Sequence, residues 1–208
     1  MKRVSLFFRA FFLIFCISSS LGIYAQTSSG LQGSGNHLNS VTFSFSNSEL
    51  PYNKKLDSAA TVSTVGSLAL PALLMLESRE AAWKAPLFYS AAVGTSFVLK
   101  EILKASFGHP RPLPYRNFYR GTDRELNDSF PSGHTALSMT AAAFTAIVYA
   151  TAYPDSNYRF PVTGSVSLLA VSSGGLRIIS GAHHPEDVVF GTIIGVAVGG
   201  IFGLLYQL

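Results

Sequence analysis

The stretch VVFGTIIGVAVGGIFGLLYQL, residues 188–208, runs for 21 residues without a formal charge. A helix needs about 20 apolar residues to cross the hydrocarbon core of a bilayer, so this stretch is long enough to span a membrane. Within it, Gly191, Gly195 and Gly199 recur at every fourth position and place small residues on one helix face. Such a stripe lets another helix approach closely, and we interpret it as a packing surface without a catalytic role.

Four further uncharged blocks precede this stretch. They contain 19, 15, 20 and 17 residues and cover 58–76, 85–99, 135–154 and 160–176. The composition agrees with them, because 48% of the residues are hydrophobic and only 12% are charged, an unusual balance for a soluble domain. The sequence therefore predicts an all-α helical bundle, embedded in the membrane by about five transmembrane helices. A soluble all-helical core is the alternative, because the second block is short and several blocks are only moderately apolar.

The first 25 residues have the features of a secretory signal peptide. Basic residues open this leader, residues 11–17 are apolar, and Ala25 provides a small residue before a predicted cleavage at Gln26. An uncleaved signal anchor is the alternative. The single cysteine, Cys16, lies in the leader, so the mature chain would contain neither a disulfide nor a thiolate metal site.

The chain then divides into the leader 1–25, a flexible or interfacial segment 26–57 rich in Ser, Gly and Asn, and a core of 58–208. If residue 26 lies outside the cytoplasm, counting the spans places residues 100–134 and 177–187 outside as well. These outer loops hold more Lys and Arg than the inner loops, which is opposite to the positive-inside rule. We attribute this excess to the binding of an anion. The bases are clustered and not scattered over a surface, so the net charge of +4 does not indicate nucleic-acid binding.

Three polar clusters lie at the ends of the apolar blocks, all on this outer side. They are KASFGHPRP at 104–112, SFPSGH at 129–134 and RIISGAHHPED at 177–187. Lys104, Arg111 and Arg177 provide three cations that can neutralise and orient a tetrahedral phosphate, the arginines through paired hydrogen bonds.

The second and third clusters add backbone donors and two imidazoles. Ser132 and Gly133 open an apolar block, so free amides at a helix start would point at the anion, together with the Ser132 hydroxyl. His183 and Asp187 are four residues apart, so the carboxylate can hold the imidazole in one tautomer as a nucleophile. His134 belongs to another helix start and can face His183 as a general acid.

These spacings resemble the type 2 phosphatidic acid phosphatase superfamily, which includes bacterial acid phosphatases and vanadium haloperoxidases. Its pattern is Lys, six residues, Arg-Pro; then Pro-Ser-Gly-His; then Ser-Arg, five residues, His, three residues, Asp. The chain matches each position except Leu176, where the family usually has Ser before the arginine. The resemblance covers about residues 58–208, which makes this part the predicted phosphatase domain.

The resemblance implies a mechanism without metal or cofactor. His183 would attack phosphorus and form a phosphohistidine, while His134 protonates the departing oxygen and then activates water. The implied phosphate-binding groups are Lys104, Arg111, Ser132, Gly133 and Arg177. Asp187 is the only acidic side chain at the matched motif positions, so no set of acidic metal ligands is present there.

A site at the outer membrane–water boundary meets the phosphates of lipids whose tails remain in the bilayer. The sequence therefore predicts a lipid phosphomonoester or pyrophosphate as substrate, and a bacterial inner-membrane enzyme whose site faces the periplasm. Family candidates are undecaprenyl pyrophosphate, phosphatidic acid, phosphatidylglycerophosphate and the phosphates of lipid A. The alternatives are a soluble periplasmic acid phosphatase acting on small phosphomonoesters and a non-catalytic protein that binds anionic headgroups. A haloperoxidase is disfavoured because those enzymes are usually much longer.

Other polar residues match no motif position. We interpret His109 as a hydrogen-bonded loop histidine, His184 as a lining or packing residue, and Glu186 as a helix-start charge. Three arginines of the loop between the first two clusters are interpreted as solvated, with headgroup or second-phosphate binding as the alternative: Arg116, Arg120 and Arg124.

Overall fold

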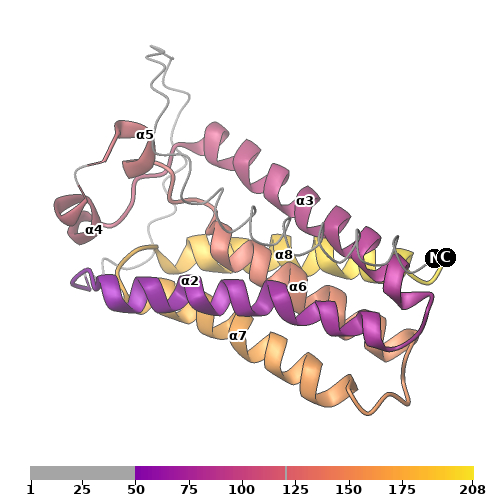
Figure 1. The fold of residues 1–208 in the computed structure, drawn as a ribbon. Helices are drawn as coiled ribbons and strands as arrows, with labels where there is room; N and C mark the ends of the chain where they lie inside the picture. Colours follow the sequence, from indigo (N-terminus) through magenta and orange to yellow (C-terminus); the bar gives the residue numbers. More distant parts are fainter. Residues whose placement is uncertain (1–49, 120) are drawn as a thin grey trace.

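The computed structural model describes residues 50–119 and 121–208, so the predicted leader and most of segment 26–57 lie outside the described residues. The described part contains seven α-helices, one 3-10 helix and no strand, which confirms the predicted all-α bundle. In order they are α2 (Lys54–Ala69), η1 (Leu70–Leu76), α3 (Ala81–Phe107), α4 (Leu113–Phe118), α5 (Asp123–Leu126), α6 (Gly133–Thr151), α7 (Arg159–Ile179) and α8 (Pro185–Leu205). Figure 1 shows the five long helices side by side, with the short α4 and α5 at one end.

Helix α6 lies at the centre of the bundle and packs against α2, α3, α7 and α8. Of its 19 residues, 13 are buried. Its buried threonines bond their own helix, for instance Thr140 Oγ1 to the Ala136 carbonyl at 2.8 Å and Thr145 Oγ1 to the Ala141 carbonyl at 2.7 Å. Because these hydroxyls are satisfied within the helix, they can be buried at little cost.

The glycine stripe of α8 lies against α6, which confirms its interpretation as a packing surface. A Cβ atom on Gly195 would lie 2.4 Å from the Ala136 carbonyl oxygen, and one on Gly199 would lie 2.4 Å from that of Thr140. Both distances are shorter than real Cβ contacts allow, so the two backbones are too close for any side chain. The close approach brings the starts of α6 and α8 together at the same end of the bundle.

We expect Gly195→Ala to destabilise the protein by about 3 kcal/mol or more, because the added methyl group overlaps the backbone of α6 and forces the helices apart. Thermal unfolding of the detergent-purified protein measures this as a fall in Tm. Gly200→Ala is the matched control on the same helix, since a Cβ there meets nothing within 4 Å. Equal Tm values for the two variants would contradict the close packing.

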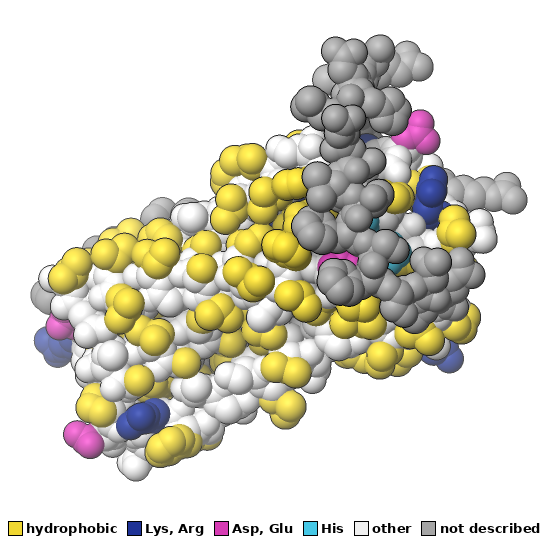
Figure 2. Space-filling model, turned by 180° about the vertical axis from the view of Figure 1, so that it is seen from behind, with side chains coloured by type: hydrophobic (Ala, Val, Ile, Leu, Met, Phe, Trp, Pro, Cys, Tyr) yellow, Lys and Arg dark blue, Asp and Glu magenta, His cyan; other side chains and the backbone are white. Residues whose placement is uncertain are grey.

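Three helical stretches of the described residues have the length and apolar composition of a membrane span: Lys54–Leu76, Arg159–Ile179 and Pro185–Leu205. Helices α3 and α6, which contain the predicted blocks 85–99 and 135–154, are not among them. Helix α3 carries charged residues near both ends, and α6 is enclosed by protein and rich in Ser and Thr. On the face drawn in Figure 2, hydrophobic side chains cover the length of the helical body and charged side chains gather at its two ends.

The polar clusters of the sequence meet at one end of the bundle. Helices α3 and α7 end there, and α2, α6 and α8 begin there, next to α4 and α5. In the turn from α7 to α8, Gly181 has φ of 70°, and a Cβ on it would lie 2.7 Å from the Leu50 carbonyl oxygen. Other residues rarely adopt this backbone conformation, so Gly181 permits the sharp turn between Arg177 and His183.

Candidate active site

A cavity of about 100 Å³ lies at this end of the bundle, where α6 begins. Its lining residues come from α3, from the segment between α3 and α6, from the start of α6 and from the turn between α7 and α8: Lys100, Glu101, Lys104, Arg111, Asp128, Gly133, His134 and His183. The structure thus places five of the predicted site residues around one cavity, namely Lys104, Arg111, Gly133, His134 and His183. The other three predicted residues do not line the cavity. Asp187 contacts His183, the Ser132 amide donates to the Asp187 carbonyl, and Arg177 donates to Thr61.

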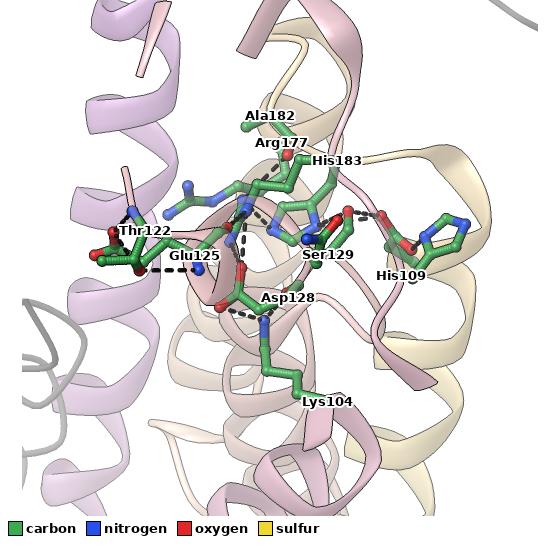
Figure 3. A network of polar contacts seen from close by, with 12 residues as sticks. Lys104, His109, Thr122, Glu125, Asp128, Ser129, Arg177, Ala182 and His183 are labelled. Atoms are coloured by element: carbon green, nitrogen blue, oxygen red, sulfur yellow. Dashed lines mark hydrogen bonds and ion pairs between the residues drawn. The ribbon is translucent and has the colours of Figure 1, made fainter. Parts of the chain in front are cut away.

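His183 lies in a chain of polar contacts that fixes both ring nitrogens (Figure 3). Its Nδ1 atom is 3.3 Å from Oδ2 of Asp187, and its Nε2 atom is 3.3 Å from Nη1 of Arg111. A guanidinium only donates, so Nε2 carries the lone pair and Nδ1 donates its proton to the carboxylate. Burial and the charge of Arg111 lower the pKa of His183 to about 4. The ring is therefore neutral at pH 7, with an unprotonated Nε2.

Asp187 is a fully buried carboxylate that connects His183 to two loops. Besides His183, its Oδ2 accepts a hydrogen bond from the Ser129 hydroxyl and one from the His184 backbone amide at 2.9 Å. Its Oδ1 lies 3.4 Å from Nδ1 of His109, an ion-pair contact when that ring is protonated, and Asp187 raises the pKa of His109. The loop histidine of the sequence interpretation therefore contacts the residue that orients His183.

Asp128 is an acid outside the sequence motifs that binds two of the predicted phosphate-binding cations. Its Oδ1 accepts from Arg111 at 2.9 Å (Nε) and 2.8 Å (Nη2), and its Oδ2 lies 3.3 Å from Nζ of Lys104. Arg111 also donates to the Ala182 carbonyl at 3.2 Å. Burial raises the pKa of Asp128, but the charges of Arg111 and Lys104 outweigh it and lower the pKa overall. Asp128 therefore stays ionised and orients both cations.

Arg177, the third predicted cation, is held by α2. Its Nη1 forms an ion pair with Asp57, and its Nη2 donates to Oγ1 of Thr61 at 2.9 Å. The same Thr61 oxygen lies 3.4 Å from Nε2 of His134, which lines the cavity. Arg177 is thus connected to the cavity indirectly, because it bonds Thr61 and Thr61 contacts His134.

The start of α6 presents backbone amides to the cavity, but the Ser132 amide is not one of them. The sequence interpretation assigns that amide and the Ser132 hydroxyl to phosphate. The Ser132 amide instead donates to the Asp187 carbonyl at 2.9 Å. The Ser132 hydroxyl accepts from Thr135 at 2.9 Å, a bond that does not use the proton of this hydroxyl. Within residues 50–119 and 121–208, the amides of Gly133 and His134 have no acceptor. These two donors at a helix start are suited to an anion, as the sequence predicts for Gly133.

Four residues of this network have no role assigned in the sequence interpretation. They are Asp57, Thr61, Asp128 and Ser129. Ser129 is the first residue of the second cluster and Asp128 directly precedes it, so their position shortly before a helix start was a usable signal. Asp57 and Thr61 are four residues apart and share a helix face, but nothing in the sequence says that Arg177 contacts this face.

The loop residues without a motif position are placed differently from one another. Arg124 is exposed and lies 4.0 Å from Glu101, whereas Arg120 lies outside the described residues. Arg116 belongs to α4, and Glu186 to the first turn of α8, as expected for a helix-start charge. The ring of His184 packs 5.2 Å from that of His109.

Within the described part of the chain, no group of three or more His, Cys, Asp or Glu side chains is arranged to hold a metal ion.

Comparison with known proteins gives one family. Residues 85–207 match the model of the PAP2 superfamily. A lipid A 1-phosphatase of Rhizobium etli is 34% identical over 115 residues, which are 53% of this chain and 44% of that protein. One of Rhizobium johnstonii is 33% identical over 115 residues, which are 53% of this chain and 41% of that protein.

The chain therefore spans less than half the length of these two curated relatives. Among solved structures, the crystal structure of Aquifex aeolicus LpxE is 27% identical, with a TM-score of 0.49 over 74% of this chain and 88% of that chain.

Proposed function

Because this chain belongs to the PAP2 superfamily, we propose that it is a metal-independent phosphatase that hydrolyses a lipid phosphate through a phosphohistidine intermediate. One observation carries the proposal. His183 has an unprotonated Nε2 beside Arg111, an Nδ1 held by Asp187, and a place in the same cavity as His134. This is the nucleophile–orienter–acid arrangement that phosphoryl transfer to a histidine needs.

In the proposed reaction, Nε2 of His183 attacks phosphorus as Arg111 turns its Nη1 donor from that nitrogen to a phosphate oxygen. The bond from phosphorus to the lipid oxygen breaks, and His134 gives its proton to that oxygen. His134 then takes a proton from water, which attacks phosphorus and releases inorganic phosphate and free His183. Lys104, Arg111 and the amides at the start of α6 stabilise the equatorial oxygens, where negative charge collects.

The membrane setting supports a lipid as substrate. Three helices are long and apolar enough to span, and exposed apolar side chains such as Leu168, Ile193 and Ile201 lie on α7 and α8. We propose that α3 and α6 cross as well, since α3 packs against α8, and α6 packs against α2, α7 and α8. The cavity at one end of the bundle would then meet phosphates at the bilayer surface, on the periplasmic side in a bacterium.

Among the lipid phosphates, we propose lipid A as the particular substrate. The two curated relatives are named lipid A 1-phosphatases, and a phosphate of lipid A belongs to the substrate class that the membrane setting favours. A phosphomonoester of this kind, or a lipid pyrophosphate, would place its phosphate among Lys104, Arg111 and the start of α6 while its acyl chains remain in the bilayer.

A panel of substrates tests this assignment. Phosphate release is measured with the purified full chain in detergent, using lipid A, phosphatidic acid, phosphatidylglycerophosphate and undecaprenyl pyrophosphate, each with and without a chelator. We expect turnover of a lipid phosphate that the chelator does not change. Turnover of a small soluble phosphomonoester alone, with release of the protein from membranes by carbonate, would favour a soluble acid phosphatase instead. Loss of activity with chelator would refute the metal-independent mechanism.

The pH dependence follows from the pKa of His183. Because burial and Arg111 lower this pKa to about 4, Nε2 stays unprotonated from neutral pH down to about pH 5, and kcat/KM should not fall through loss of the nucleophile there. Below about pH 4, the proton occupies the attacking lone pair, and kcat/KM should drop about tenfold per pH unit. Recovery of activity on return to pH 7 controls for unfolding. A fall that begins at about pH 6.5, the ordinary value for histidine, would contradict the lowered pKa.

A further inference from the structure

We propose that Asp57 and Thr61 of α2 are positioning residues for the reaction, which set Arg177 and His134 in place before the substrate binds. Helix α2 precedes the part of the chain that matches the family model, so the family motifs assign no role to these two residues. The inference rests on the proposed phosphatase activity and extends its machinery to a helix outside the three motifs.

The guanidinium of Arg177 is fixed by two side chains one helical turn apart. Asp57 pairs with Nη1, and Thr61 accepts from Nη2 at 2.9 Å. Asp57 is itself held by the hydroxyl of Tyr52, which donates to its second carboxylate oxygen at 2.9 Å. With only 4% of Arg177 exposed, its side chain is immobilised in advance, so less conformational entropy is lost when an anion binds.

One donor of this guanidinium remains unused. The Nε atom of Arg177 is buried and has no hydrogen-bond partner among the described residues. Because a buried N–H group without an acceptor is unfavourable, its presence indicates an acceptor that arrives with the substrate. Asp57 and Thr61 hold the two Nη atoms, and this leaves the Nε side of the guanidinium for a phosphate oxygen.

Thr61 also contacts the general acid. Its Oγ1 accepts from Arg177 and lies 3.4 Å from Nε2 of His134 and 3.3 Å from the Asp57 carbonyl oxygen. A hydroxyl has one proton and two lone pairs, so Thr61 can donate to a neutral His134 or accept from a protonated one while it keeps its bond to Arg177. The phosphate-binding arginine and the proton donor are therefore held by the same oxygen atom.

A second threonine on α2, Thr64, provides a control that distinguishes positioning by Thr61 from a purely structural role. Thr64 is buried, and its Oγ1 bonds Oγ of Ser173 on α7 at 2.7 Å. This bond also ties α2 to α7, but neither residue lines the cavity, and neither side chain is hydrogen-bonded to the guanidinium of Arg177. Thr64→Val therefore removes one buried bond between the same two helices and leaves the contacts to Arg177 and His134 unchanged.

The test compares Thr61→Val, Asp57→Asn and Thr64→Val in the full chain, with a lipid phosphate as substrate and vanadate as a mimic of the transition state. We expect Thr61→Val and Asp57→Asn each to lower kcat/KM about tenfold or more and to raise the vanadate inhibition constant by a similar factor. Thr64→Val should change both by less than about twofold, and Thr61→Ser, which keeps the hydroxyl, should restore most of the activity.

A double-mutant comparison completes the test. In an Arg177→Ala background, Asp57→Asn should lower kcat/KM no further, because the residue that it positions is gone. Wild-type rates in Thr61→Val, equal losses in Thr61→Val and Thr64→Val, or additive effects of Asp57→Asn and Arg177→Ala would each overturn the inference while leaving an active phosphatase. A wild type that releases no phosphate from any lipid would instead refute the proposed function, on which the inference depends.

Discussion

His183→Ala should lower kcat by about four orders of magnitude or more, the largest effect that we expect from any substitution in this chain. The variant lacks the Nε2 atom that we propose attacks phosphorus, and no other side chain that lines the cavity takes its place beside Arg111. The fold should persist, because the His183 backbone amide still donates to the Arg177 carbonyl at 3.1 Å. The measurement is single-turnover phosphate release, together with the Tm of the purified variant.

His184→Ala is the matched control for this experiment. It removes the neighbouring imidazole, while the His184 backbone amide still bonds Asp187. We expect less than about a tenfold loss, since His184 does not line the cavity. If His183→Ala retained substantial turnover while His184→Ala lost it, the assignment of the nucleophile would be wrong.

Arg111→Lys should lower kcat/KM by about 10²–10³, although the charge is kept. The guanidinium directs separate N–H groups at the Asp128 carboxylate, the Ala182 carbonyl and Nε2 of His183. A single ammonium group cannot reproduce these directions or grip two phosphate oxygens at once. KM should rise and kcat should fall, and steady-state kinetics with a lipid phosphate measure both constants.

A second substitution at the same position separates charge from geometry. Arg111→Gln removes the charge that helps to lower the pKa of His183, so the acid limb of the pH profile should move to higher pH. Arg111→Lys keeps the charge and should leave that limb in place. Arg116→Lys is the control in the same loop, since Arg116 does not line the cavity. Near-normal kinetics for Arg111→Lys would contradict the proposed grip on phosphate.

The convergence of the motifs was predictable from the sequence because each motif stands at the end of an apolar block. Helices of similar length that pack side by side bring their ends to common levels, so Lys104, His134 and His183 were expected to meet. The glycine stripe of α8 was equally informative, since a run of small residues at every fourth position has one common use in helix packing.

The partners of the motif residues were not predictable in the same way. Asp57 lies 120 residues from Arg177, and such a pairing depends on how α2 is rotated about its axis. The apolar residues of α2 do not reveal this rotation, because in a membrane protein both the buried and the lipid-facing sides can be apolar. Likewise, the hydrogen bond from the Ser132 amide to the Asp187 carbonyl depends on how closely α6 and α8 approach.

The acids around the cavity have a consequence for the end of the catalytic cycle. Around the cavity Lys100 pairs with Glu101, Lys104 and Arg111 pair with Asp128, and Arg177 pairs with Asp57. A phosphate that enters must displace part of this pairing, and when it leaves the carboxylates reclaim their cations. Free inorganic phosphate, which has no acyl chains to anchor it in the bilayer, therefore competes for the cavity at a disadvantage, and the proposed enzyme is protected from retention of its own product.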